Sequence, residues 1–257
     1  DPFTDPNPVD IFGMTERAEA FMTKQAQARR PFYLQMSYYA LHLPENALES
    51  TRAFYEKQPP GRMHSDVNRA AITTDLDTGV GRLLAAVDRL GLSNSTYVIY
   101  MSDNGAGDGG GGRGKGGGGG RGQLRPLTAG KGGVWEGGIR VPLIVRGPGI
   151  APSSWCHQRV VGYDFFPTIC ALAGVTKPLP SNLEGGDLSH LFSGSNEPVR
   201  RPREALVFHF PHYQGDTPHS AILSGRHKLI HYYETGENRL FDLQADIGET
   251  KNLAAAK

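Results

Sequence analysis

The sequence has few cysteines, no long apolar run and no excess of charge of either sign. Its 257 residues include only two cysteines, Cys156 and Cys170, which are too few for a disulfide framework. Basic and acidic side chains number 27 and 26, so net charge gives no reason to expect a nucleic acid or a membrane surface as a partner. No apolar run reaches the ~18–20 residues that a membrane-spanning helix requires.

The two cysteines also give no support for a zinc site. Cys170 lies in the apolar stretch 168–172, which is typical of a small core residue. Cys156 stands between Trp155 and His157, but no other Cys or His has finger-like spacing from it. The chain does not open with Met and shows no signal peptide, which by itself gives no evidence about its compartment.

Over the first 200 residues, patterns typical of helices alternate with patterns typical of strands. Thr15 is expected to cap the first helix, and Asp164 stands at the start of the last one. Strands that alternate with helices predict an α/β fold, with a mainly parallel sheet sandwiched between helices. The expected helices cover residues 15–28, 66–90 and 165–173, and the expected strands cover 32–40, 97–101 and 141–145.

The pattern changes after about residue 200. Short strand candidates separated by turn signals predict a small antiparallel sheet over 205–210, 220–223, 228–233 and 239–243. We therefore divide the chain into an α/β domain, 1–200, and a small C-terminal subdomain, 201–257. Glycine fills 13 of the 18 positions in 105–122, so a mobile loop is expected there. Its three basic residues, without an aromatic side chain, do not favour RNA binding.

Polar side chains follow two of the expected strands. In a parallel α/β sheet, ligands gather at the carboxyl ends of the strands. His42 comes two residues after the first strand, and Asp103 and Asn104 come two and three residues after the strand 97–101. Lys131 lies in a glycine-rich approach to the next strand. If the strands are neighbours, His42 and the Asp103–Asn104 pair lie on one rim of the sheet.

These residue types suit an anionic ester. The oxygens of Asp103 and Asn104 are donors for a hard cation such as Ca²⁺ or Mg²⁺. Such a cation and Lys131 can neutralise ester oxygens, while His42 transfers a proton or binds the leaving group. The residues alone leave a plainer interpretation open, in which Asp-Asn-Gly is a turn, the lysine is solvated and the histidine is a loop residue.

Five stretches, in order along nearly the whole chain apart from the glycine tract, resemble the type I sulfatase family of the alkaline-phosphatase-like superfamily. The stretch from Gly-Lys-Gly-Gly to Val-Pro resembles the second signature of the family and is the most specific of them; Ser-Asp-Asn-Gly alone would be a weak match. The stretches are 31–44, similar to the segment ending in Pro-His-x-Pro; 97–105, similar to the metal-binding motif; 130–142, the second signature; 164–168, a helix start; and 228–254, the C-terminal end.

The resemblance implies an enzyme, a sulfuric ester hydrolase that cleaves sulfate monoesters of sulfated sugars or aryl sulfates. It implies that Asp103 and Asn104 are Ca²⁺ ligands and that Lys131 and His42 are catalytic residues contacting the sulfate group or the leaving oxygen. The segment 208–213 looks like one that approaches the substrate in some members, which makes His212 a substrate-binding candidate. Family members are typically periplasmic, secreted or lysosomal.

The chain departs from the family pattern in three ways. The family nucleophile is a formylglycine made within Cys/Ser-x-Pro-x-Arg, and the sequence contains no such motif. The Asp-Asp pair that supplies further metal ligands is also absent, and Leu41 stands where proline is usual. Because Ca²⁺ takes six to eight oxygen ligands, two residues are too few. We therefore expect an incomplete chain that is inactive alone and needs a missing N-terminal segment or a companion chain.

Two other functions remain open. One is a phosphoesterase or phosphonate hydrolase of the same superfamily, which a side-by-side assay of aryl sulfate and aryl phosphate would separate from a sulfatase. The other is a catalytically dead protein that binds sulfated glycans. The coding sequence upstream of Asp1 separates that possibility from an incomplete enzyme.

Overall fold

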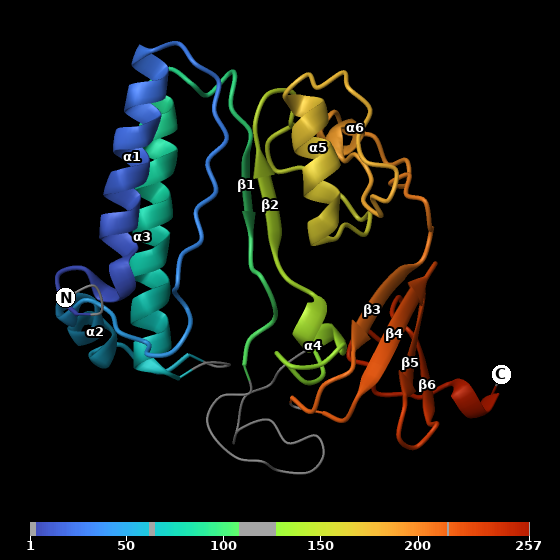
Figure 1. Ribbon diagram of the computed structural model, residues 1–257. Helices are drawn as coiled ribbons and strands as arrows, with labels where there is room; N and C mark the ends of the chain where they lie inside the picture. The colour runs from blue at the N-terminus through green and yellow to red at the C-terminus, as the bar shows by residue number, and fades with distance from the viewer. Residues whose placement is uncertain (1–3, 62–64, 108–126, 215, 257) are drawn as a thin grey trace. The chain divides into compact units, whose positions relative to one another are not determined.

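A computed structural model describes residues 4–61, 65–107, 127–214 and 216–256 (Figure 1). The chain divides into two compact units, Asp1–Tyr97 and Val98–Lys257, and each is described by itself. The domain boundary that the sequence predicts near residue 200 falls inside the second unit and stays a prediction. Most of the glycine-rich stretch 105–122, for which a mobile loop was expected, lies outside the described residues.

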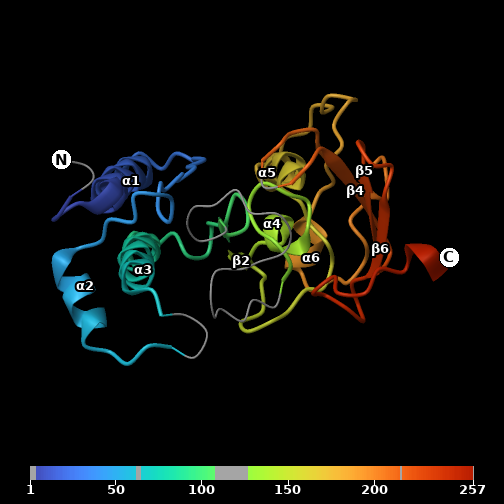
Figure 2. The ribbon, with the colours of Figure 1, turned by 90° about the horizontal axis from the view of Figure 1, so that it is seen from below.

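The first unit is helical. Its core consists of Val9, Ile11, Ile72 and Leu76, and α1 and α2 both pack against α3 (Figures 1 and 2). Among the described helices, none is both long and apolar enough to cross a membrane. The elements are η1 (Pro8–Asp10), α1 (Ile11–Gln27), α2 (Glu49–Glu56) and α3 (Val67–Arg89).

The start of α1 differs from the prediction. The helix begins at Ile11, so Thr15 lies inside it and is not its cap. The side-chain oxygen of Asn7 accepts hydrogen bonds from the backbone N–H groups of Phe12 and Gly13, at 3.0 and 2.9 Å. Because Asn7 satisfies these free donors, the helix can begin one turn earlier than expected. Thr15 is buried, and its hydroxyl donates to the Ile11 carbonyl.

The prediction for α3 is confirmed. Asp66 caps the helix, since its carboxylate accepts from the backbone N–H of Arg69 at 3.0 Å. Gly91 follows the last turn with a φ of +70°, a left-handed conformation that glycine adopts without steric cost.

The expected strand over 32–40 is not formed within the described residues. This segment is extended, and Tyr38 and Ala40 pack against the core of the first unit. A strand is defined by its ladder of backbone hydrogen bonds to a neighbour. Within the part of the chain that the structure describes, no strand pairs with 32–40, and Tyr38 and Ala40 pack instead on the helical core of the first unit.

The second unit begins with a pair of short strands, β1 (Val98–Met101) and β2 (Leu143–Arg146). They pair antiparallel, with Val98 opposite Arg146 and Met101 opposite Leu143. The mainly parallel sheet that the sequence predicted is therefore not present among the described strands. Parallel neighbours need a long crossover, usually a helix, and the helix described between β1 and β2 is the four-residue α4 (Glu136–Ile139).

Three short helices follow β2: η2 (Gly162–Asp164), α5 (Phe165–Leu172) and α6 (Ser189–Phe192). Asp164 stands at the start of α5, as predicted, but its buried carboxylate accepts hydrogen bonds from the backbone of Val161 and Gly186 and pairs with Arg201. Both cysteines are free thiols; Cys156 is exposed. Cys170 is half-buried, which corrects its assignment to the core, because one side of the short α5 remains open.

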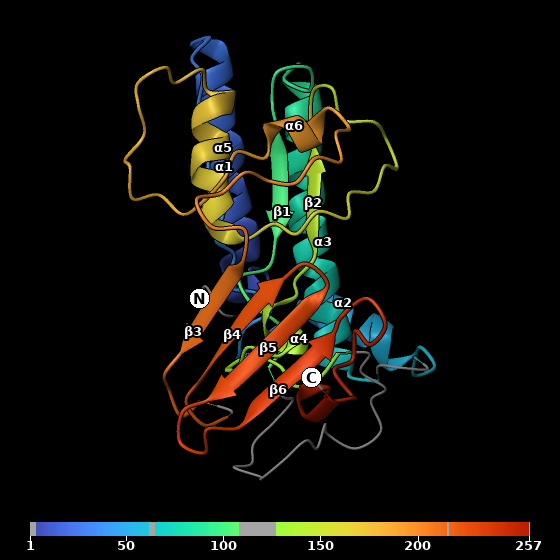
Figure 3. The same ribbon diagram turned by 90° about the vertical axis from the view of Figure 1, so that its right-hand side faces the viewer.

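The small C-terminal antiparallel sheet is confirmed. Its strands run in the order β3-β4-β5-β6, each antiparallel to the next (Figure 3). One face of the sheet packs against Val134 and Trp135 in a cluster that includes Leu206, Ile230 and Phe241. The elements are β3 (Leu206–Phe210), β4 (His219–Ser224), β5 (His227–Tyr232), β6 (Asn238–Asp242) and η3 (Ala254–Ala256).

Candidate functional site

The turn after β1 is hydrogen-bonded to the segment that carries Lys131, residues 128–139 (the Lys131 segment). The backbone N–H of Gly105 donates to the Gly138 carbonyl at 2.9 Å, and that of Lys131 donates to the Ala106 carbonyl at 3.0 Å. These two bonds join segments that are separated by the glycine tract in the sequence. The structure thus brings the Asp103–Asn104 turn and Lys131 together within the second unit.

The glycines in these two segments allow the backbones to approach. A Cβ on Gly105 would lie 1.8 Å from the Gly137 carbonyl oxygen, and one on Gly137 would lie 2.3 Å from the Ala129 oxygen. A Cβ on Gly138 would meet the Gly133 oxygen at 2.3 Å. Since real side chains cannot occupy such positions, this arrangement of the two segments requires glycine at each of them.

Asp103 and Asn104 form a turn and keep two oxygens available. Asp103 Oδ1 accepts from the backbone N–H of Asn104, and the Asn104 amide nitrogen donates to the Gly105 carbonyl, both at 2.9 Å. The Ser102 hydroxyl donates to the Asn104 carbonyl. Among the described residues, Asp103 Oδ2 and Asn104 Oδ1 have no hydrogen-bond donor. The turn interpretation and the ligand interpretation are therefore compatible.

The donor types fit a calcium ion, but their number does not complete a site. One carboxylate and one amide oxygen suit a hard cation, which takes six to eight oxygens. Across the described ranges there is no group of three or more His, Cys, Asp or Glu side chains that could hold a metal. The part of the chain that the structure describes can supply a portion of the ligands only.

Lys131 lies beside the connection between β3 and β4. Its side chain is half-buried and has no ion-pair partner among the described residues. Gly132 has a φ of +97°, and a Cβ there would lie 2.7 Å from the carbonyl oxygen of Gln214. His212, two residues earlier, is exposed, and its ring meets that of Phe210 edge to face at 5.4 Å. The segment of His212 is thus adjacent to the segment of Lys131.

His42 belongs to the first unit. It is exposed; its Nδ1 lies 2.9 Å from the Leu43 carbonyl oxygen, and its ring centroid is 5.1 Å from that of Tyr39. Because each unit is described by itself, the structure does not bring His42 together with Asp103, and their shared rim stays a prediction.

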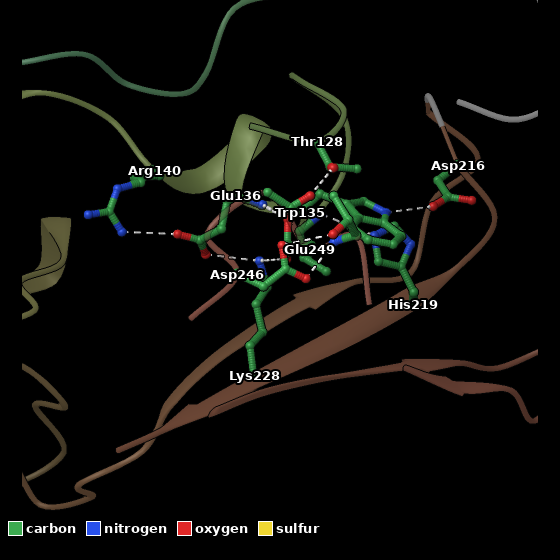
Figure 4. Close-up of polar contacts among 12 residues, drawn as sticks. Thr128, Trp135, Glu136, Arg140, Asp216, His219, Lys228, Asp246 and Glu249 are labelled. Carbon is green, nitrogen blue, oxygen red and sulfur yellow. Dashed lines mark hydrogen bonds and ion pairs between the residues drawn. The ribbon is translucent and has the colours of Figure 1, made fainter. Parts of the chain in front are cut away.

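A buried ion cluster that the sequence analysis did not identify lies under the Lys131 segment (Figure 4). Lys228, Glu136 and Glu249 are only 0%, 2% and 5% exposed. The Lys228 ammonium donates to Glu136 Oε1 at 3.0 Å. It also lies 2.8 Å from Glu249 Oε1, in an ion pair whose angles fall outside hydrogen-bond geometry. Arg140 reaches the other oxygen of Glu136 at 3.2 Å.

The electrostatics of this cluster follow from its burial. Burial raises the pKa of the Glu249 carboxyl above its ordinary value, and Lys228 opposes that rise. The cluster had a signal in the sequence, because Lys228 alternates with Ile230 and Tyr232 on the inner face of β5. A lysine at an inward-facing strand position must find a buried partner.

Further side chains hold the same segment. The Val134 backbone N–H donates to Nε2 of the buried His219 at 3.1 Å. The Trp135 indole N–H donates to Asp216 Oδ2 at 3.3 Å, and the Tyr232 hydroxyl donates to the same oxygen at 2.7 Å. Burial, together with that bond to Asp216, raises the Tyr232 pKa. Val134 and Trp135 are therefore fixed by the C-terminal sheet and its loops.

Comparison with known proteins identifies the class of this fold first. A crystal structure of Ps i-CgsB matches with a TM-score of 0.78 and 26% identity, covering 96% of this chain and 51% of that one. The same protein in complex with k-i-k-neocarrahexaose matches with a TM-score of 0.77, 25% identity and the same coverage. A "putative sulfatase" from Bacteroides fragilis matches with a TM-score of 0.73 and 20% identity, covering 95% of this chain and 54% of that one. These matches confirm the predicted alkaline-phosphatase-like α/β fold of the sulfatases, although the described strands β1 and β2 pair antiparallel.

Sequence families then identify the group. The Sulfatase family matches residues 3–175, and the family described as N-sulphoglucosamine sulphohydrolase, C-terminal, matches residues 130–257. The chain belongs to the sulfatase family, which confirms the resemblance. A "Sulfatase" of Formosa agariphila is 32% identical over 91% of this chain and 44% of its own length. Arylsulfatase A of Homo sapiens is 32% identical over 94% of this chain and 48% of its own.

The chain spans about half the length of the curated relatives it matches. The activity of the whole protein and the roles of individual residues are therefore proposals, even though the family is established.

Proposed function

We propose that this chain forms part of a sulfuric ester hydrolase, which cleaves a sulfate monoester with water to an alcohol and sulfate. One observation carries the proposal. In a sulfatase-family chain, backbone hydrogen bonds from Gly105 and Lys131 join the Asp103–Asn104 turn to the Lys131 segment. The oxygens of Asp103 and Asn104 and the Lys131 ammonium then lie in adjoining segments, and this combination suits an anionic ester.

The residues have separate roles in this proposal. Asp103 and Asn104 would hold Ca²⁺ through their available oxygens, and the bound cation would supply charge stabilisation for the ester oxygens. Lys131 would contact the sulfate group, and its ammonium would offset charge there. His42 would bind the leaving oxygen or hold its proton. The remaining calcium ligands and the formylglycine nucleophile would come from residues outside this chain.

A sulfated glycan is the proposed substrate class. Two solved relatives support it: Ps i-CgsB in complex with k-i-k-neocarrahexaose, and a protein in complex with its substrate D-glucosamine-2-N,6-O-disulfate. The latter matches with a TM-score of 0.55 and 25% identity, over 74% of this chain and 36% of that one. His212, exposed beside the Lys131 segment, would contact the sugar. A periplasmic, secreted or lysosomal location belongs to the same proposal.

The test uses the complete protein that contains this chain. It should hydrolyse aryl sulfate faster than aryl phosphate and lose activity when calcium is chelated. Lys131→Ala should lower kcat/KM for the sulfate ester by about 100- to 1,000-fold, the usual effect of removing one stabiliser of developing charge. Lys177→Ala is the matched control, because Lys177 is an exposed lysine of the same unit.

Other outcomes would reject the proposal. Near-normal kinetics in Lys131→Ala would remove Lys131 from the site. Faster cleavage of aryl phosphate would indicate the phosphoesterase, and glycan binding without hydrolysis would indicate the catalytically dead protein.

A further inference from the structure

Two neighbouring residues of the C-terminal tail, the stretch 243–256 that follows β6, bond to the Lys131 segment near both of its ends. The Thr128 hydroxyl donates to the carbonyl of Gly248. The backbone N–H of Glu136 donates to Glu249 Oε2 at 2.7 Å. The tail therefore contacts the chain three residues before Lys131 and five residues after it.

Lys228, on β5, links the same segment and tail through ion pairs. Its ammonium lies between the carboxylates of Glu136 and Glu249, at 3.0 and 2.8 Å, and all three side chains are buried (Figure 4). Glu136 belongs to α4, which forms the end of the Lys131 segment, and Glu249 belongs to the tail. One cation thus joins three parts of the chain: strand, segment and tail.

Stability alone does not explain why this buried cluster is charged. Lys228 lies on the inner face of β5 between apolar neighbours, where an apolar side chain could pack. Replacing a buried ion pair with well-packed apolar residues is often neutral or stabilising. What a charged cluster adds is direction, since three of the four carboxylate oxygens of Glu136 and Glu249 accept hydrogen bonds.

Any displacement of Glu136 would be passed on to Lys131. The backbone N–H of Gly137 donates to the Thr128 carbonyl at 2.9 Å, which closes the segment into a loop. Within that loop, the positions of the Gly137 and Gly138 Cα atoms leave no room even for a Cβ. A loop packed this closely has little freedom to absorb a shift at its base.

We propose that Lys228, Glu136 and Glu249 are positioning residues, which fix the Lys131 segment against the Asp103–Asn104 turn. The inference deepens the proposed function and rests on it for the effect on catalysis. None of the three is a catalytic residue, because they are buried beneath the segment. They act through the backbone that places Lys131.

The test compares two buried cations of the same unit in the complete protein. Lys228→Met removes the centre of the cluster. Arg201→Met removes the buried partner of Asp164, an ion pair in a different part of the unit, with side chains 6% and 0% exposed. Both variants should lower the melting temperature. Only Lys228→Met should lower kcat/KM per folded molecule, by about 10- to 100-fold, with weaker competitive inhibition by inorganic sulfate.

Amide hydrogen exchange provides a readout that does not depend on the reaction. In Lys228→Met, exchange over residues 127–140 should accelerate while the protein remains folded, and in Arg201→Met it should not. If exchange responds in this way but the wild type does not cleave sulfate esters, the proposed function fails and the positioning role stands.

The conservative variant Glu136→Gln covers the case in which Lys228→Met does not fold. The amide keeps one acceptor for Lys228 and nearly the shape of glutamate, so it should fold and show the same two effects more weakly. The positioning role is overturned if a folded variant of the cluster loses thermal stability while its kcat/KM, its inhibition by sulfate and its exchange over 127–140 all stay within about twofold of the wild type.

Discussion

The two regions that bear the proposed site residues are held in very different ways. In the second unit, the Lys131 segment is hydrogen-bonded to the Asp103–Asn104 turn and rests on the buried cluster of Lys228, Glu136 and Glu249. In the first unit, His42 is exposed, and it contacts its own neighbours Tyr39 and Leu43.

The difference shows which half of the site the chain itself organises. Lys131 and the Asp103–Asn104 turn of the second unit are placed by contacts between residues far apart in the sequence. The histidine of the first unit is placed by the local course of its loop. We therefore expect substitutions near Lys131 to affect stability and activity together, and substitutions at His42 to affect activity alone.

The largest loss of stability is expected for Gly105→Ala. The added Cβ would lie 1.8 Å from the Gly137 carbonyl oxygen, so the two segments must separate. The free energy of unfolding should fall by about 3 kcal/mol, as in overpacked cores, and kcat/KM by at least about 100-fold. Gly107→Ala is the control, because a Cβ there meets no atom of the described residues within 4 Å. Equal behaviour of the two variants would show that the close approach is not needed.

A smaller loss of stability is expected for Asp75→Asn in the first unit. The buried Asp75 carboxylate accepts hydrogen bonds from the Leu48 backbone and the Thr51 hydroxyl, both at 2.7 Å, and so holds the start of α2 on α3. The amide keeps one acceptor and loses the other, which should cost about 1 kcal/mol. Chemical denaturation measures this loss, with the exposed Asp77→Asn as the control.

The same variant tests whether the Lys131 segment is independent of the first unit. Hydrogen exchange over 127–140 should not change in Asp75→Asn, because the cluster that fixes this segment lies wholly in the second unit. Faster exchange there would mean that the segment depends on the first unit as well.

The smallest effect on stability is expected for His42→Ala. An exposed side chain with local contacts should change the free energy of unfolding by less than about 0.5 kcal/mol. Turnover of a sulfate ester by the complete protein should nevertheless fall about 100-fold or more, if His42 handles the proton of the leaving oxygen. His157→Ala, another exposed histidine, should leave both quantities unchanged. A His42→Ala protein with normal turnover would remove His42 from the site.

Elements built from local patterns were predicted well. The four C-terminal strands lie within two residues of their predicted bounds, because alternation along each strand is itself a local signal. The helix 67–89 has its cap, Asp66, and its terminating glycine, Gly91, in the sequence beside it. The glycines around Lys131 were recognised as a motif, although their physical reason, the close approach of two backbones, became visible only in the structure.

Predictions that depended on distant neighbours were less successful. The segment 32–40 has an apolar pattern suited to a strand, but the pattern does not say whether it packs on helices or pairs in a sheet. The apolar runs at β1 and β2 likewise did not reveal that they pair antiparallel. Whether His42 meets Asp103 depends on how two units are arranged, which no local pattern encodes.

The amino-acid sequence settled the family and predicted Asp103, Asn104 and Lys131 as site residues, because motifs and periodicities are properties of consecutive residues. The tertiary structure alone revealed what lies beneath them. Glu136 bonds to Lys228 across 92 positions and to Glu249 across 113. A buried charge requires a partner but does not specify where in the chain that partner lies, so only folding could bring these three side chains together.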